Sequence, residues 1–426
     1  MLCLHPADPP KRLPLRLLAA ASVLGLYVRV GELGSYAVTV GGMAAAAVLL
    51  VSLREVRLSL APLAIAAALL LWPLLLFLGA SLAEATLLPT ADVFLQSYAL
   101  WAASVVLIGL AILSNRPLQP PAPFALASII LLVAGAQWLM AGLAGSLAGF
   151  ELVAPLLGID LVHGYLRMEP GWGVRAIGLY YEPSMCGRVL GTLAFIDFLQ
   201  HRRAMRAAGV LLAALLLTKS LGLLVLAAAI GTILLGRSPR GALALALLGV
   251  LVAGVQGGAI EQRLRNDAAV QAEASTYRRT VAPLAPLVET LAANPAGVAI
   301  GAAELVADAT GYAERTGEAK ITNGIYEVLL YFGVLGVAAL SAALVGVAAL
   351  VFSGRREAAA ALLYLLLSTA LSGSFLSIES SLLTYYFIVA CRAAARPARP
   401  AVESGAATEA ARARRPAWGR PAGVPL

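Results

Sequence analysis

The stretch Arg175-Ala-Ile-Gly-Leu-Tyr-Tyr-Glu182-Pro183-Ser184 is a polar strip between two long apolar segments near the middle of the chain. It places an arginine and a carboxylate directly before an apolar run, as at the water-facing rim of a membrane helix. A second polar region, from Gly257 to Thr322, is the other long break in an otherwise apolar sequence. We expect the two regions to face each other on one side of a membrane.

The composition of the whole chain is that of a membrane protein. Hydrophobic residues make up 60% of the 426 residues and charged residues 13%, far outside the composition of soluble domains. A spanning segment must satisfy its backbone hydrogen bonds internally, because the bilayer core holds no water. A barrel would alternate polar and apolar residues, which this chain does not do. The sequence therefore predicts an all-α, polytopic protein whose solvent is the lipid bilayer.

The apolar runs approach the length of about 20 residues that a bilayer requires. We predict about twelve spans, at residues 14–31, 36–53, 59–79, 97–114, 124–148, 184–200, 205–218, 221–236, 240–256, 324–352, 357–376 and 380–395. The run from Ala204 to Leu235, interrupted only by Lys219-Ser220, could instead form one long tilted helix. The charge pattern favours two short helices joined by a tight turn at Lys219.

The arginines of the short loops indicate the topology, because basic short loops stay in the cytoplasm. The loops on the side of the basic N-terminus contain Arg54, Arg57, Arg116, Arg202, Arg203, Arg206, Arg237, Arg240, Arg355 and Arg356. The opposite loops carry Glu32, Glu84, Asp92 and Glu379 with little positive charge. Both termini are therefore predicted to be cytoplasmic, and the long loops at 149–183 and 257–322 to lie outside. The membrane domain would cover 1–395, and the basic tail 396–426 would be disordered.

The net charge of +8 comes mostly from these loops and the tail, so it indicates topology and no nucleic-acid partner. The three cysteines and three histidines are scattered along the chain. No disulfide framework, metal site or cofactor is expected from them.

Arg175 and Glu182 are the first candidates for chemistry, since they lie where a lipid headgroup would lie. A guanidinium stays charged and offers a fork of donors that matches phosphate oxygens. A carboxylate beside it can take the proton of a sugar hydroxyl as general base. Pro183 suits the first turn of a helix, whose N-terminus adds positive potential. Alternatively, Glu182 only stabilises that helix dipole.

The remaining polar residues of these regions have two interpretations each. Arg278 and Arg279 could bind phosphate or anchor the loop at the interface. Lys219 could add a phosphate contact, although a turn residue is the default interpretation. Tyr180 and Tyr181 could stack on sugars or lie in the interfacial aromatic belt, which is the default.

Two charged residues within the predicted span 184–200 are expected to be structural. Arg188 should extend along the helix to the interface, as long cationic side chains do near helix ends. Asp197, near the other end, should pair with the basic loop at Arg202 and Arg203.

Three segments, in order, resemble motifs of the O-antigen ligase and polymerase superfamily, the Wzy-like membrane glycosyltransferases. Residues 175–184 resemble an Arg-x-x-Gly…Glu-Pro-Ser motif before a span. Residues 218–222 resemble a Thr-x-Ser-Arg-x-Gly turn without its usual arginine. The segment 278–297, with its arginines and Asn-Pro-Ala-Gly turn, continues into Asn323…Glu327…Gly333…Gly336, which resembles the family's third motif. The resemblance covers roughly residues 170–340.

The resemblance implies an inverting, metal-independent glycosyltransferase of the bacterial inner membrane. It would polymerise undecaprenyl-diphosphate-linked oligosaccharide repeat units into exopolysaccharide or O-antigen at the periplasmic face, with a flippase and a chain-length regulator as partners. Arg175, Arg279 and Glu182 would be catalytic, whereas Arg278, Tyr181, Lys219 and Asn323 would bind substrate.

Three alternatives remain open from the sequence: a ligase, a transporter or flippase, and a non-enzymatic scaffold in a polysaccharide assembly complex. Ligases of this superfamily, which transfer glycan to lipid A core or protein, carry a histidine where this chain has Thr322. That departure favours the polymerase. A transporter or flippase of lipid-linked sugars would place its polar groups near the bilayer midplane, commonly in paired repeats, and neither feature is evident in this sequence.

Overall fold

The structure of the chain is a computed structural model. It describes residues 13–33, 36–53, 60–114, 117–120, 122–144, 148–157, 175–180, 182–236, 238–252, 254, 277, 280–319, 321, 323–371, 374 and 376–395. The helices of these ranges are α1 (Leu13–Leu24), α2 (Val40–Leu53), α3 (Leu60–Leu82), α4 (Ala91–Leu113), α5 (Pro123–Ala144), α6 (Ala148–Glu151), α7 (Ala154–Leu157), α8 (Pro183–His201), α9 (Ala204–Thr218), α10 (Leu221–Leu235), Pro239–Val252, α13 (Leu284–Ala293), α14 (Ala303–Ala309), α15 (Tyr312–Thr316), α16 (Gly324–Phe352), α17 (Arg356–Leu371) and α18 (Ile378–Ala395).

This helical architecture confirms an all-α membrane protein. Four of the described helices contain a stretch long and apolar enough to cross a bilayer, namely Ala64–Leu82, Ala91–Leu113, Pro123–Ala141 and Gly324–Phe352. Ile65, Leu75 and Leu78 of α3 are more than half exposed, and lipid is the solvent that such an outward apolar face requires. The number of about twelve spans and the orientation of the termini stay predictions.

The N-terminal region differs from the predicted span 14–31. Its helix α1 has 12 residues and gives way to a two-stranded antiparallel hairpin, β1 (Arg29–Leu33) and β2 (Tyr36–Thr39). Val40 then begins α2, and its amide donates to the carbonyl of Val28 at 2.9 Å. Hydropathy missed the hairpin because its strands, RVGEL and YAVT, are short and continue the apolar runs on either side, and periodicity cannot separate a short strand from a helix end.

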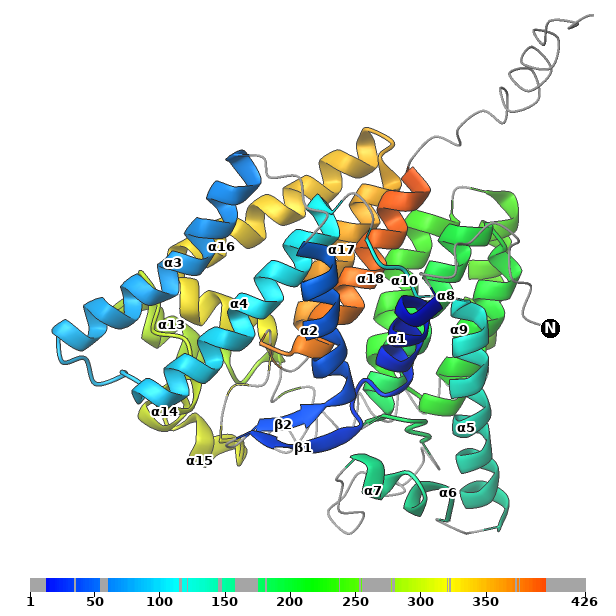
Figure 1. Cartoon of the computed structure of the whole chain (residues 1–426), viewed down its shortest axis with the longest axis horizontal. Coiled ribbons are helices and arrows are strands. Elements are labelled where there is room, and N and C mark those ends of the chain that lie inside the picture. Colours follow the sequence, from blue (N-terminus) through cyan, green and yellow to red (C-terminus); the bar gives the residue numbers. More distant parts are fainter. Residues whose placement is uncertain are drawn as a thin grey trace, which may run out of the picture.

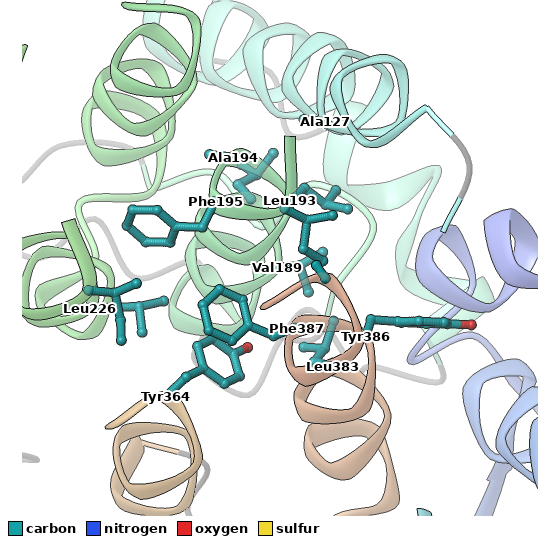
Figure 2. Close-up of a cluster of buried hydrophobic side chains, with 14 of the residues drawn as sticks. Ala127, Val189, Leu193, Ala194, Phe195, Leu226, Tyr364, Leu383, Tyr386 and Phe387 are labelled. Carbon is teal, nitrogen blue, oxygen red and sulfur yellow. The ribbon is translucent and has the colours of Figure 1, made fainter. Parts of the chain in front are cut away.

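The centre of the bundle is formed by α8 and α18, which contact each other and are buried over nearly their whole length. Helices α5, α9 and α10 surround α8, whereas α2, α4 and α17 surround α18. Figure 2 shows the packing between them, where Phe387 of α18 stacks on Tyr364 of α17 with ring centroids 4.2 Å apart. Because protein surrounds these two helices, they can carry polar side chains that a lipid-facing helix could not.

A separate apolar cluster holds the described part of the second long loop, the α13–α15 unit, against α16. The first helix of this unit, α13, packs on α16. Trp101 of α4 packs on Phe332 of α16 with ring centroids 5.3 Å apart. This cluster is built from Leu287, Val298, Ile300, Ala302, Ala303, Val306, Ala307, Tyr312, Ile321, Leu330, Tyr331 and Phe332.

Helix α16 is broken at Gly333, whose φ of 54° and ψ of −133° are not helical. The turn Pro295-Ala296-Gly297 inserts at this break. Val298 N donates to Leu330 O and Val334 N donates to Pro295 O, both at 2.9 Å. A Cβ at Gly333 would collide with the Pro295 carbonyl oxygen and lie 2.5 Å from the amide nitrogen of Gly297. The glycine therefore lets two backbones meet where a side chain would keep them apart.

Figure 1 shows how these parts are distributed along the bundle. The β1–β2 hairpin, α6, α7, α14 and α15 lie toward the lower end of the view, and the C-terminal end of α18 lies at the opposite end. The α6–α7 part of the first long loop and the α14–α15 part of the second are thus at the same end of the molecule. That both loops lie outside the cytoplasm stays a prediction.

Candidate functional site

The polar strip before α8 lies along the end of α9. The amide of Ala176 donates to Leu217 O at 2.9 Å, and Arg175 Nε donates to Thr218 O at 3.3 Å. Carbonyls at a helix C-terminus have no partner within the helix and carry partial negative charge, so they attract a guanidinium. Arg175, which is half-buried, is fixed beside the turn that joins α9 to α10.

Gln137 of α5 holds the same strip from the other side. Its side-chain oxygen accepts hydrogen bonds from Ile177 N at 3.1 Å and Gly178 N at 2.8 Å, and its Nε2 donates to Gly178 O at 2.9 Å. The side chain is 1% exposed. The sequence analysis missed this residue, although a glutamine inside an otherwise apolar span is itself a signal, because a buried amide requires partners.

Lys219 forms the turn between α9 and α10. Its backbone is left-handed, with φ of 48°, and Ser220 caps α10 by accepting a hydrogen bond from Leu223 N. The two short helices predicted on either side of Lys219 are therefore confirmed. Gly187 of α8 packs on this turn, where an added Cβ would lie 3.0 Å from Ser220 Cβ. The turn thus lies against the beginning of α8.

The charge of Lys219 is disfavoured in its surroundings. Partial burial lowers the pKa of the ammonium, and repulsion from Arg175 lowers it further. Two cations are held near each other in a partly desolvated place, which is a cost to the free protein. A bound anion would offset that repulsion, so the pair has the electrostatics of a phosphate site.

Glu182 is placed at the beginning of α8, with Pro183 as the first helical residue. Its backbone is extended, and its carbonyl accepts from Met185 N and Cys186 N. The carboxylate forms no bond to the helix amides; it accepts from Ser184 Oγ at 2.8 Å. The half-buried Glu182 therefore lies at the N-terminus of α8 with its carboxylate turned to Ser184.

Arg188 does not extend to the interface as the sequence predicted. It is 4% exposed, and its guanidinium lies inside the bundle, where Nη2 donates to Tyr27 Oη at 3.1 Å. Its Nε and Nη1 are buried without a hydrogen-bond partner. A buried charged donor left unpaired costs about 1–3 kcal/mol or more. The prediction failed because α8 is surrounded by protein, so the side chain has no short path to water or headgroups.

Tyr180 is also buried and belongs neither to the aromatic belt nor to a sugar-stacking surface. It is 0% exposed, donates to Val23 O at 3.1 Å and packs edge-on against Tyr27, with ring centroids 6.1 Å apart. A buried phenol needs an acceptor for its hydroxyl, and the carbonyl near the end of α1 supplies it. Tyr180 thereby ties the strip before α8 to α1.

Asn323 and Glu327, which belong to the third family-like motif, lie at the start of α16. Asn323 caps the helix by accepting from Ile325 N at 2.9 Å. Glu327 is 2% exposed and accepts from Ser374 Oγ at 2.8 Å. The Asn…Glu spacing is thus a helix start with a buried carboxylate in its first turn, stabilised by the helix dipole.

Three residues of the sequence-based site, Tyr181, Arg278 and Arg279, lie outside the described residues, as does Thr322. The roles assigned to the three remain predictions. Within the described ranges, Arg175 lies beside Lys219 at the end of α9, and Glu182 precedes α8, whose Gly187 packs on the Lys219 turn. In the same ranges, no group of three or more metal-ligating side chains is present.

Asp197 lies at the other end of α8 and pairs differently from the prediction. Its carboxylate accepts from Arg206 Nη2 at 2.5 Å and Nε at 2.6 Å, and His201 Nδ1 lies 3.0 Å from it. Arg202 instead pairs with Glu357 at 3.2 Å. The chain reverses at Arg202 in a left-handed conformation, which directs the next turn, with Arg206, back toward Asp197.

Comparison with protein families places this geometry in a known context. Residues 14–393 match the family described as WcaD colanic acid polymerase. The chain belongs to this family. It is therefore a multi-pass membrane polymerase of the glycosyltransferase type that acts in polysaccharide biosynthesis. The comparison with curated proteins and the comparison with solved structures each gave no match. The resemblance to Wzy-like repeat-unit polymerases is confirmed by this match.

Proposed function

We propose that the protein polymerises oligosaccharide repeat units carried on undecaprenyl diphosphate, at the periplasmic face of the bacterial inner membrane. The observation that carries the proposal is the pair of cations Arg175 and Lys219 beside the turn on which α8 packs, in a chain of the WcaD family. Two cations suit a diphosphate. Glu182, at the start of α8, is the carboxylate assigned to deprotonate a hydroxyl. The product would be an exopolysaccharide or O-antigen, and the family name points to colanic acid.

The reaction proposed is a single displacement with inversion and without metal. A hydroxyl oxygen of the acceptor unit attacks the anomeric carbon of the lipid-linked donor chain. The bond from that carbon to the diphosphate oxygen breaks, and undecaprenyl diphosphate leaves with the bonding electrons. Glu182 takes the hydroxyl proton. Arg175 and Lys219, with Arg278 and Arg279 of the second loop, neutralise the charge that develops on the diphosphate.

The sugar contacts are assigned to Asn323 and Tyr181. Asn323 stands at the start of α16, next to the buried Glu327, and an amide is a suitable partner for sugar hydroxyls. A flippase that delivers the units and a regulator of chain length are the partners such a reaction requires. The lipid carrier would reach the site through the bilayer.

The test is the glycan profile of a deletion strain complemented with wild type, Arg175→Ala, Arg279→Ala, Glu182→Ala or the control Arg203→Ala. Arg203 is an exposed cation after the far end of α8, so its variant checks for a general effect of lost charge. Membrane levels of each protein are measured in parallel.

The proposal expects long chains with wild type and Arg203→Ala, and single lipid-linked repeat units with the deletion and the other variants. Long chains that accumulate on the lipid carrier in the deletion strain and are never transferred would show a ligase instead. Normal polymer in every variant would refute the site assignment, and normal polymer in the deletion strain would refute the function.

A further inference from the structure

Arg188 is the charged group that the proposed reaction leaves unexplained. It lies in the second turn of α8, next in sequence to Gly187, which packs on the Lys219 turn. Successive helical residues are about 100° apart around the axis, so Arg188 points to a different side. There it meets Tyr27, which its Nη2 contacts at 3.1 Å, and interacts electrostatically with Tyr364 of α17.

No carboxylate in the described part of the chain forms an ion pair with Arg188. Glu182 and Glu379 lie close enough to Tyr27 to act on it electrostatically, yet both are engaged elsewhere. Glu182 accepts from Ser184 Oγ at 2.8 Å. Glu379 accepts from Thr39 Oγ1 and Ser377 Oγ, each at 3.0 Å. The guanidinium keeps Nε and Nη1 buried and unpartnered, and these two nitrogens carry most of its donor hydrogens.

We propose that Arg188 binds a phosphate group of a lipid-linked sugar diphosphate on the Tyr27 side of α8, as a second phosphate contact distinct from Arg175 and Lys219. This inference rests on the proposed function. A buried unpaired guanidinium is a cost to the free protein that a bound oxyanion would remove, because charge-assisted hydrogen bonds to phosphate are the strongest that arginine makes. The N-terminus of α8 adds positive potential to the same region.

The neighbouring groups also fit a sugar phosphate better than a bare anion. Glu182 and Glu379 disfavour a highly charged ion, but a carboxylate accepts hydrogen bonds from sugar hydroxyls readily. Arg188 contacts Tyr27, and Tyr27 lies within electrostatic range of both carboxylates. This combination matches a ligand with phosphate at one end and hydroxyls at the other. A transferase that joins two lipid-linked units must hold two diphosphates, and two phosphate contacts on different sides of α8 would serve this purpose.

The test uses the full-length protein in detergent with Arg188→Met, Arg188→Lys and the exposed control Arg203→Met. Methionine keeps an unbranched stem and removes the unpaired charge. Thermal unfolding is measured without ligand and with undecaprenyl diphosphate, undecaprenol or inorganic pyrophosphate. Stabilisation by a ligand reports its affinity through mass action.

The proposal predicts that Arg188→Met is at least as stable as wild type without ligand, and that its affinity for undecaprenyl diphosphate falls by about tenfold or more. Arg188→Lys should restore part of that affinity, and Arg203→Met should bind as wild type does. Pyrophosphate should stabilise wild type more than Arg188→Met, and the effect of undecaprenol should be the same in both.

Other outcomes overturn the inference. A lower unfolding temperature of ligand-free Arg188→Met would show that the guanidinium serves the fold. Equal affinity of wild type and Arg188→Met for undecaprenyl diphosphate would exclude the contact. If Arg188→Met lost affinity for undecaprenol as much as for undecaprenyl diphosphate, phosphate would be excluded as the partner of Arg188. If wild type binds undecaprenyl diphosphate and only the Arg188 dependence is missing, the proposed function survives. If wild type does not bind it at all, both fail.

Discussion

Replacing Gly333 by alanine should release the α13–α15 unit from α16. The turn Pro295-Ala296-Gly297 crosses the break in α16 so closely that a Cβ at Gly333 would lie 2.5 Å from the Gly297 amide nitrogen. The backbone of Gly333, with φ of 54° and ψ of −133°, is also one that side chains disfavour. Alanine must therefore either distort the helix break or push the turn away.

The magnitude follows from the contacts that are lost. Holding a non-glycine residue in a rare backbone region costs about 1–3 kcal/mol. The two hydrogen bonds that join the turn to α16 contribute about 1 kcal/mol each. The α13–α15 unit should thus be loosened by about 3–5 kcal/mol, which raises its local opening by two or more orders of magnitude. The α8–α18 core belongs to a separate apolar cluster and should keep its stability.

Hydrogen exchange followed by mass spectrometry, on protein in detergent, measures this opening directly. Faster exchange is expected in Leu284–Ala293 and at Val298, with unchanged exchange in α8, and polymer formation should fall. Gly354→Ala is the matched control, since Gly354 also has a positive φ, of 75°, but has open space around it. Wild-type protection in Gly333→Ala, or an equal loss in Gly354→Ala, would refute the reasoning.

Three further predictions concern the surroundings of α8. Gln137→Leu removes three hydrogen bonds to the strip after Arg175, at about 1 kcal/mol each; polymer yield at equal membrane level should fall, and wild-type yield would contradict the role assigned. Arg206→Met leaves the carboxylate of Asp197, which is 1% exposed, without its guanidinium partner. The substitution should lower the free energy of unfolding by about 3–5 kcal/mol, seen as a lower unfolding midpoint, and adding Asp197→Asn should restore part of this loss. The pKa of Lys219 lies below its usual 10.5. Between the lowered pKa and 10.5 the unfolded chain binds more protons than the folded one, so the free energy of unfolding rises with pH. In the same range the ammonium loses its proton, and phosphate binding by Lys219 falls. Lys219→Arg should therefore move the alkaline limb of the rate profile to higher pH, and an unmoved limb would exclude Lys219 from the site.

Hydropathy and loop charge were enough to predict most of the helices, because span length and backbone satisfaction are strong constraints in a bilayer. The turn at Lys219 and the helix start at Pro183 also followed from local rules. The β1–β2 hairpin did not, since strands of four or five residues at the ends of apolar runs cannot be told from helix ends by periodicity. The break in α16 depends on the distant Pro295-Ala296-Gly297 turn, so no local pattern at Gly333 could reveal it.

The placement of Arg175 and Glu182 just before α8 was predictable, because both adjoin a span; their roles stay predictions. The burial of Arg188 was not predictable, because whether its side chain reaches the interface or stays inside the bundle depends on which helices surround α8. Gln137 and Tyr180 have roles that depend on partners far along the chain, the strip after Arg175 and the carbonyl of Val23. Such tertiary hydrogen bonds produce no recognisable residue spacing in the sequence.

The most direct test of polymerase function is reconstitution of the purified protein in proteoliposomes with undecaprenyl-diphosphate-linked repeat units as the only substrate. Products are resolved by chain length, and released undecaprenyl diphosphate is quantified. We predict a ladder of longer glycans, with one lipid diphosphate released for each unit added, and none with Arg175→Ala. Units that stay single with wild-type protein, while the same preparation moves them across the bilayer, would contradict the account and show a transporter.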